Sequence, residues 1–163
     1  MNHLVIAPLL LPLLGGVALI LIRESATTLR RTISVASSFA LIGIAVALLA
    51  EVTSEGILVY RLGDWPAPFG IVLVADPLAA IMVLITTILA GCVMLYVLRG
   101  SDREARYFHV LFQLQLFGLI GAFLTGDLFN LFVFFEVLLI ASYGLLLHGG
   151  GARRTRAGLH YVV

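Results

Sequence analysis

The sequence predicts an all-α protein, a polytopic bundle of transmembrane helices. Hydrophobic residues make up 61% of its 163 residues and charged residues only 12%. A soluble domain carries roughly 25% charged residues. The charged residues are confined to short segments between long apolar runs, and several runs approach the roughly 20 residues that a helix needs to cross a bilayer. No soluble domain is visible in this pattern.

Two uncharged runs open the chain. The first predicted span covers residues 4–22 and contains Pro8 and Pro12, which membrane helices tolerate where neighbouring helices satisfy the freed carbonyls. No basic residue precedes this run, so we interpret it as a retained span rather than a signal peptide. The second predicted span covers residues 32–50 and is rich in small residues spaced four apart. Such spacing lets membrane helices pack closely.

A polar connection at residues 51–72 separates these spans from the rest. Two short runs rich in β-branched and aromatic residues, 57–62 and 69–74, flank the turn-forming sequence GDWPAP. This pattern is typical of a β-hairpin. We therefore expect a short hairpin-like excursion in a loop outside the membrane.

Three further spans follow. Asp76 and the proline after it form a typical helix start, so the third span is expected at 77–98. The fourth is expected at 107–125. Asp127 is a candidate N-cap for the fifth, at 128–147.

The chain closes with a glycine- and arginine-rich loop at 148–157 and a short apolar run at 158–163. Six residues cannot form a span. The sequence therefore predicts five complete spans and the start of a sixth, in a single membrane domain over residues 1–163 that belongs to a longer protein.

The arginines predict the orientation. Nine of the ten lie in the segments 23–31, 99–106 and 148–157, which the predicted spans place on one side, and Arg61 lies on the other. Basic residues in short loops favour the cytoplasmic side. We therefore expect a multi-pass protein of the plasma membrane with these loops in the cytoplasm and the N-terminus outside.

The strongest functional candidate is Glu136, near the middle of the fifth span and the only residue there that can be charged at neutral pH. A carboxylate at that depth costs roughly 2.5–3.5 kcal/mol on insertion scales. We therefore expect it to be buried against protein or a wet cavity, as a protonatable residue or ion-pair member of an ion path. The structural alternative is a protonated carboxyl that makes one interhelical hydrogen bond.

Three residues are weaker candidates. Tyr143 is the only residue on the helix face of Glu136 that can hydrogen-bond the acid directly. His109 and Gln113 lie one helical turn apart on the fourth span and could extend a wet path. A hydrogen bond between helices is the simpler explanation for both.

Other chemistry finds no support in the sequence. It contains a single cysteine, Cys92, no metal-ligand spacing and no phosphate or dinucleotide fingerprint. We expect no metal and no cofactor. The net charge of +1 gives no reason to expect a nucleic acid partner.

Residues 126–149 read GDLFNLFVFFEVLLIASYGLLLHG, which closely resembles the D-type subunit of the multisubunit (Mrp-type) monovalent cation/proton antiporters. Supporting matches are MNHLVIAPLLLPLL at the N-terminus, VLVADPLAAIMVLIT before and within the third span, and the closing RAGLHYVV. The resemblance thus covers essentially the whole chain. That type of subunit is related to antiporter-like membrane subunits of respiratory complex I and of membrane-bound hydrogenases.

The resemblance implies an ion-translocating subunit that works in a hetero-oligomer with other antiporter subunits in the bacterial inner membrane, with protons and monovalent cations as substrates. Glu136 falls on the family's glutamate of the fifth span, which is thought to pair with a lysine on a later helix. This sequence contains no lysine. Because the family's subunits have more than twice as many spans, the resemblance implies an N-terminal portion that does not transport by itself.

Two other functions stay open. One is a membrane subunit of a redox-driven proton pump, in which the chain would belong to an enzyme complex although it is not itself an enzyme. The other is a non-transporting assembly segment in which Glu136 only packs helices.

Overall fold

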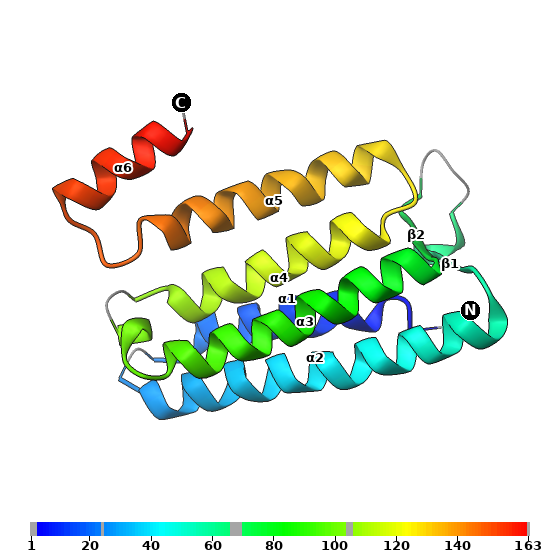
Figure 1. Ribbon diagram of the computed structural model, residues 1–163, viewed down its shortest axis with the longest axis horizontal. Coiled ribbons are helices and arrows are strands. Elements are labelled where there is room, and N and C mark those ends of the chain that lie inside the picture. The colour runs from blue at the N-terminus through cyan, green and yellow to red at the C-terminus, as the bar shows by residue number, and fades with distance from the viewer. Residues whose placement is uncertain (1–2, 24, 66–69, 104–105, 163) are drawn as a thin grey trace.

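The computed structural model describes residues 3–23, 25–65, 70–103 and 106–162. Within these ranges, six α-helices and two β-strands follow one another (Figure 1). Their bounds are α1 Ala7–Leu21, α2 Thr27–Glu55, β1 Leu58–Arg61, β2 Val72–Ala75, α3 Pro77–Val97, α4 Phe108–Leu124, α5 Leu128–Leu146 and α6 Ala152–Val162, with 3-10 turns at Leu62–Asp64 and Ser101–Arg103.

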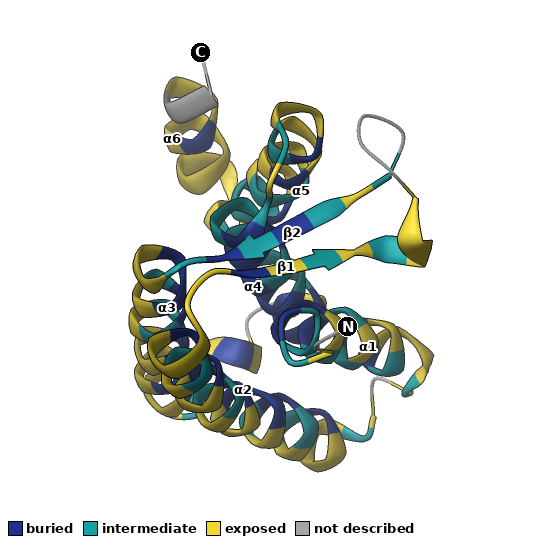
Figure 2. Cartoon of the chain, turned by 90° about the vertical axis from the view of Figure 1, so that its right-hand side faces the viewer, coloured by how far each residue is buried: buried dark blue, intermediate teal, exposed yellow. Residues whose placement is uncertain are grey.

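The first four helices form an up-and-down bundle. α1 packs against α2 and α4, and α3 packs against the same two helices. α2 and α4 therefore face each other across the bundle axis, and the buried residues of all four helices point inward (Figure 2). α5 packs on the outside of α4. α6, at the end of the chain, packs against α5 (Figure 1).

The expected helical membrane fold is confirmed, but the count of five complete spans is not. Among the described residues, α2, α3 and α5 are long and apolar enough to cross a membrane, whereas α1 and α4 are apolar but shorter. α4 has 17 residues because the backbone becomes extended at Thr125, which forms an isolated β-bridge with Leu73 of β2. α1 has 15 residues because residues 3–6 form a turn rather than helix.

α2 departs most from its expected bounds. It has 29 residues, beginning at Thr27 and ending at Glu55, rather than the expected 32–50. Nothing in the polar flanks breaks a helix, and Gly56, with φ of 85°, ends it. Arg30 and Arg31 therefore lie on the first turns of a helix rather than in a loop.

The predicted hairpin is confirmed. β1 and β2 pair antiparallel from Leu58 opposite Ala75 to Arg61 opposite Val72. Part of the predicted second strand, at residue 69, lies outside the described residues. The amide of Gly126 donates a hydrogen bond of 2.8 Å to the carbonyl of Val72. The hairpin is thus joined to the turn between α4 and α5.

Both predicted caps are confirmed. Asp76 accepts a hydrogen bond from the amide of Ala79 at 2.6 Å, with proline at the first helical position. Asp127 accepts one from the amide of Asn130 at 2.7 Å. Each carboxylate satisfies an amide that the first turn of a helix leaves without a partner.

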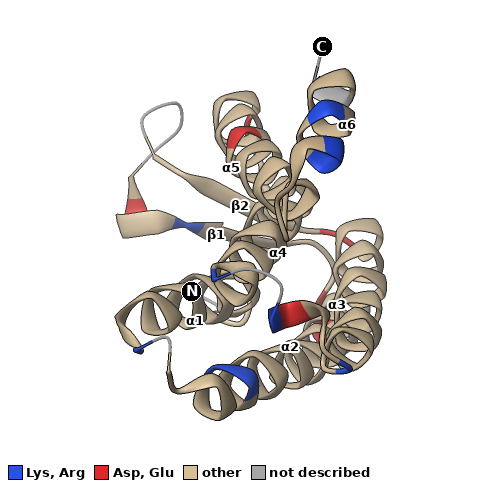
Figure 3. Cartoon of the chain, turned by 90° about the vertical axis from the view of Figure 1, so that its left-hand side faces the viewer, with Lys and Arg blue, Asp and Glu red and all other residues tan. Residues whose placement is uncertain are grey.

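The three arginine-rich segments meet at one end of the bundle, which we call the arginine end (Figure 3). Arg31 of the first segment binds Asp102 of the second. His148 of the third lies 2.8 Å from the carbonyl of Ser101. The hairpin and the turn between α4 and α5 lie at the opposite end (Figure 1).

Candidate functional site

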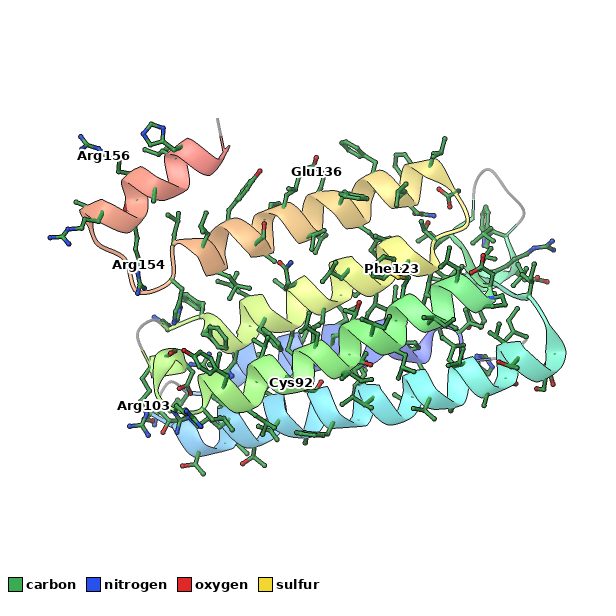
Figure 4. All side chains as sticks on the ribbon, viewed as in Figure 1. Cys92, Arg103, Phe123, Glu136, Arg154 and Arg156 are labelled. Carbon is green, nitrogen blue, oxygen red and sulfur yellow. The ribbon has the colours of Figure 1, made fainter. Side chains whose placement is uncertain are left out.

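Glu136 lies near the middle of α5, on a face of the helix that is exposed. Its side chain points away from α4 (Figure 4). The residues that share this face are also exposed and apolar, among them Phe129, Phe132 and Ile140, which expose 76%, 63% and 66% of their surface. Glu136 is therefore a single ionisable group on an otherwise apolar surface.

The opposite face of α5 makes its contact with the bundle. The ring of Phe134 occupies the space where a side chain at Gly121 would lie. A Cβ at Gly118 would lie 2.9 Å from the backbone nitrogen of Leu138. These glycines let the two helix backbones approach closely, and they fix which face of α5 is turned outward.

The expectation that Glu136 is buried is therefore wrong for the described part of the chain. Among those residues, no hydrogen bond or ion pair to its carboxylate is found. The physical reason is the rotation of α5, since the helix turns its Phe134 face toward α4 and thereby carries the acid to the far side.

Tyr143 is not joined to Glu136 by any hydrogen bond within the described residues. It is partly buried and lines a small apolar pocket between α5 and α6, together with Leu146, Leu147 and Leu159. The structure thus places this tyrosine two turns from the acid, against the final helix.

His109 and Gln113 lie inside the bundle, and both have partners. His109 Nε2 lies 3.3 Å from Asp102 Oδ2. Gln113 Oε1 accepts a hydrogen bond of 3.3 Å from the hydroxyl of Ser37 on α2. Both residues are buried, exposing 6% and 0% of their surface. They connect α4 to its neighbours, far from the exposed face of α5.

Asp102 is at the centre of a buried ionic contact with Arg31 and His109. Arg31 donates two hydrogen bonds to it, from Nε at 2.6 Å and from Nη2 at 2.5 Å. Only 3% of the Asp102 side chain is exposed, against 21% for Arg31. Burial alone would raise the pKa of Asp102, but the hydrogen bonds and charge of Arg31 outweigh it and hold the pKa below its usual range.

Sequence reasoning missed Asp102 and Arg30 as buried groups, and Arg31 as the ion-pair partner of Asp102, because it counted all three as loop charges. One signal could have indicated the contact: Asp102 lies within an arginine-rich segment, seven residues before His109. A carboxylate there is placed to neutralise several nearby cations.

The described residues contain no group of three or more His, Cys, Asp or Glu side chains that could hold a metal ion. Cys92 is free and exposed on α3.

Solved structures define the class of fold. The chain matches the membrane-bound sulfane sulfur reductase, an archaeal respiratory membrane complex, with a TM-score of 0.92 and 26% identity over 99% of this chain and 34% of that chain. It matches the Mrp complex from Dietzia sp. DQ12-45-1b with a TM-score of 0.87 and 29% identity over 98% of this chain and 30% of that one. The class is that of the helical membrane subunits found in such complexes.

Proteins related in sequence narrow this class to one kind of subunit. The chain is 52% identical over 167 residues to the D-type subunit of a probable K+/H+ antiporter of Rhizobium meliloti, covering 99% of this chain and 31% of that protein. It is 46% identical to the D-type subunits of the Na+/H+ antiporters of Alkalihalophilus pseudofirmus and Bacillus subtilis, covering 100% of this chain and 33% of each. The expected resemblance to the D-type antiporter subunits is confirmed, and the chain spans about a third of the length of these relatives. No protein-family model matches the chain.

Proposed function

We propose that the chain is part of an ion-translocating membrane subunit, the D-type subunit of a multisubunit Na+(K+)/H+ antiporter. The observation that supports this most is the 52% identity with such a subunit of a probable K+/H+ antiporter over 99% of the chain. The substrates would be protons and monovalent cations, and the partners would be the other subunits of a hetero-oligomeric complex in a bacterial inner membrane. The chain is then the N-terminal part of a longer subunit.

Glu136 is the proposed proton-exchanging residue, and the geometry sets a condition on that role. A carboxylate in the middle of an apolar helix face costs roughly 2.5–3.5 kcal/mol if it faces lipid. The face of α5 that carries it must therefore be covered by protein or water in the working complex. The relatives are about three times as long as this chain, so they contain further segments that can cover this face.

The proposal includes five membrane spans, although α1 and α4 are short. A helix of 15 or 17 residues is below the roughly 20 needed for an average bilayer, but local thinning of the bilayer accommodates the difference at a modest cost. The turn before α1 and the extended residues after α4 then complete the crossing within the bundle, where backbone groups find partners.

The central test is Glu136→Gln, which keeps the shape of the side chain but removes its proton exchange. We expect the variant to assemble into the antiporter complex and to lose cation/proton exchange in inverted membrane vesicles. Ser142→Ala is the matched control, because the Ser142 hydroxyl on the same helix donates to its own backbone, at the carbonyl of Leu139. Exchange at the wild-type rate in Glu136→Gln would refute the assignment of the acid.

A second function is favoured by one observation, the TM-score of 0.92 with a chain of the archaeal sulfane sulfur reductase. In that case the chain would be part of the membrane arm of a redox-driven pump. Purification of the native complex separates the two functions, because flavin and iron–sulfur subunits should co-purify only with a redox-driven complex.

An assembly role without transport predicts a different result for the same variant. If Glu136 only packs helices, Glu136→Gln should disturb assembly and leave exchange per assembled complex unchanged. Normal assembly with lost exchange therefore argues against this role.

A further inference from the structure

Buried polar side chains form two facing rows inside the bundle at the arginine end. On α2 the row is Arg30, Ser34 and Ser37, which expose 7%, 0% and 6% of their surface. Facing it are His109 and Gln113 of α4, exposing 6% and 0%. The spacing within each row is three or four residues, so each row follows one face of its helix.

Two polar contacts, which we call cross-links, connect α2 with the α4 side of the bundle. At the inner end, the Ser37 hydroxyl donates to Gln113 Oε1 at 3.3 Å. At the outer end, Asp102 accepts from Arg31 and lies 3.3 Å from His109 Nε2. Because α2 and α4 face each other across the bundle, the two rows lie toward its axis.

Four buried polar atoms on these rows have no hydrogen-bond partner among the described residues. They are Arg30 Nε, Ser34 Oγ, His109 Nδ1 and Gln113 Nε2. A buried polar group without a partner is costly, and native structures rarely leave one. Four on two facing rows indicate a ligand rather than four separate defects.

The chemistry of these atoms identifies the ligand. Asp102 is an acceptor, so His109 Nε2 carries the hydrogen and the neutral ring offers Nδ1 as an acceptor. Arg30 Nε and the Gln113 amide nitrogen are donors. Only a ligand that both donates and accepts satisfies the set, and water is the small ligand that commonly bridges otherwise unsatisfied buried polar groups.

Beyond Gln113 the buried side chains of the bundle are mostly apolar, and the hydroxyl of the buried Thr87 donates to its own helix, at the carbonyl of Leu84. The buried side chains there include Leu41, Leu48, Leu116, Ile120 and Leu124, each exposing 3% or less. Water between the rows therefore has no polar route toward the hairpin end within the described residues. Among the described residues, the polar route from the two rows to the aqueous phase passes Asp102 at the arginine end.

We propose that the arginine-end half of the bundle axis is a dead-end water pocket through which His109 exchanges protons, with the Arg31–Asp102 ion pair as its gate. Water donates to Nδ1 of neutral His109. Protonation transfers one proton from that water chain to Nδ1, and deprotonation returns it. Neither Glu136 nor antiport takes part in this exchange. The water pocket and the proposed function can therefore be tested independently.

The charged groups that face His109 are Asp102, Arg30 and Arg31. The neighbouring helices α1 and α3 contain no charged side chain. Within the described residues, the gate is therefore the ionic contact that a variant must alter.

Water in the pocket is tested by X-ray hydroxyl-radical footprinting of the membrane-embedded protein, read by mass spectrometry, because radicals form from bound water itself. We expect strong modification of His109 despite its burial. Phe134 is the internal control, an aromatic side chain of similar burial, 8% exposed, packed in the α4–α5 contact. Gln113→Leu should reduce modification of His109 at least about tenfold. Equal, low modification of His109 and Phe134 would overturn the proposal.

The gate is tested by deuterium exchange at the carbon between the two ring nitrogens of His109, which requires both water and ring protonation. Arg31→Lys keeps the charge but loses the bidentate hydrogen bond to Asp102. Because this weakens the gate, we expect about tenfold faster exchange at His109. Arg99→Lys is the matched control, an arginine of the adjoining segment outside the buried rows, and should leave the rate unchanged.

His148, partly exposed in the same protein, is the reference for complete exchange. A His109 that stays unexchanged after His148 has exchanged fully would overturn the role of His109. An unchanged rate in Arg31→Lys would overturn the gate.

Discussion

Asp102 illustrates how one residue can hold two helices together. Its carboxylate is almost fully buried and binds Arg31 at the start of α2 while lying beside His109 at the start of α4. A buried ion pair gains little over apolar packing, but removing one partner leaves a buried charge without compensation. The contact therefore contributes specificity of packing at the arginine end more than net stability.

Asp102→Asn should destabilise the protein by about 1.5–3 kcal/mol, the range for hydrogen bonds to charged groups. The measurement is thermal unfolding in detergent, followed by the loss of helical signal. Asp64→Asn is the control, because Asp64 is an exposed aspartate in the hairpin. Equal unfolding temperatures for the two variants would contradict a stabilising contact between α2 and α4 through Asp102.

The same contact predicts a pH dependence. Because the pKa of Asp102 is lowered in the folded protein, its stabilising contribution is fully present above the ordinary aspartate pKa of about 3.9 and is lost as the pH falls through the lowered value. Stability should therefore fall below about pH 4 in the wild type. In Asp102→Asn this part of the decrease should be missing, as unfolding titrations at several pH values would show.

At this scale the sequence was informative about which residues matter but not about where they point. Glu136, His109 and Gln113 could be identified because polar groups inside apolar runs are costly. The outward direction of Glu136 could not, because it depends on Gly118 and Gly121 of another helix. Its assignment to an ion path stays a prediction.

Among the helices, the contact of α4 with α5 is set by glycine. The backbone of α5 lies so near Gly118 that a Cβ there would meet the nitrogen of Leu138 at 2.9 Å. Backbone atoms cannot move aside as a flexible side chain can. The position and rotation of α5, and with them the direction of Glu136, therefore depend on the absence of side chains at Gly118 and Gly121 of α4.

Gly118→Ala should displace α5 and cost about 1–3 kcal/mol, as overpacking does in tight cores. Gly43→Ala is the matched control, since a Cβ at Gly43 meets nothing within 4 Å. Alanine there should be neutral or stabilising by up to about 1 kcal/mol, because it is the better helix former. Thermal unfolding compares the two variants. A greater loss of stability in Gly43→Ala than in Gly118→Ala would contradict the close approach of α5 to Gly118.

The elements themselves were largely predictable. The caps at Asp76 and Asp127 and the hairpin follow from local chemistry, and the sequence placed all three correctly. The ends of α2 were not predicted, because hydropathy marks where lipid contact ends and not where a helix ends. The shortness of α4 was missed for another reason, since Thr125 is held by a strand distant in sequence.

Across the whole molecule, the alternation of the helices brings three separate arginine-rich segments to one end (Figure 3). The contacts Arg31–Asp102 and His148–Ser101 join these segments. The sequence predicted their common side from the alternation of spans. Which side of the membrane this end faces stays a prediction that rests on the preference of basic loops for the cytoplasm.

The orientation can be tested with single cysteines after Cys92→Ala. Ala152→Cys lies at the arginine end and Ser54→Cys at the end of α2 near the hairpin, and both positions are exposed. In intact cells a membrane-impermeant thiol reagent should label Ser54→Cys and not Ala152→Cys. In inverted vesicles the pattern should reverse. Labelling of Ala152→Cys in intact cells would reverse the assigned orientation.

The junction of the hairpin with the turn before α5 has a mechanical consequence. The amide of Gly126 is bonded to Val72, and Thr125 bridges Leu73, so a tilt of α5 about its capped end pulls directly on the second strand. A movement of α5 would thus be transmitted to the hairpin, which the sequence predicts to lie outside the membrane. On that prediction, a fluorophore on the hairpin would report such a movement without any label on α5.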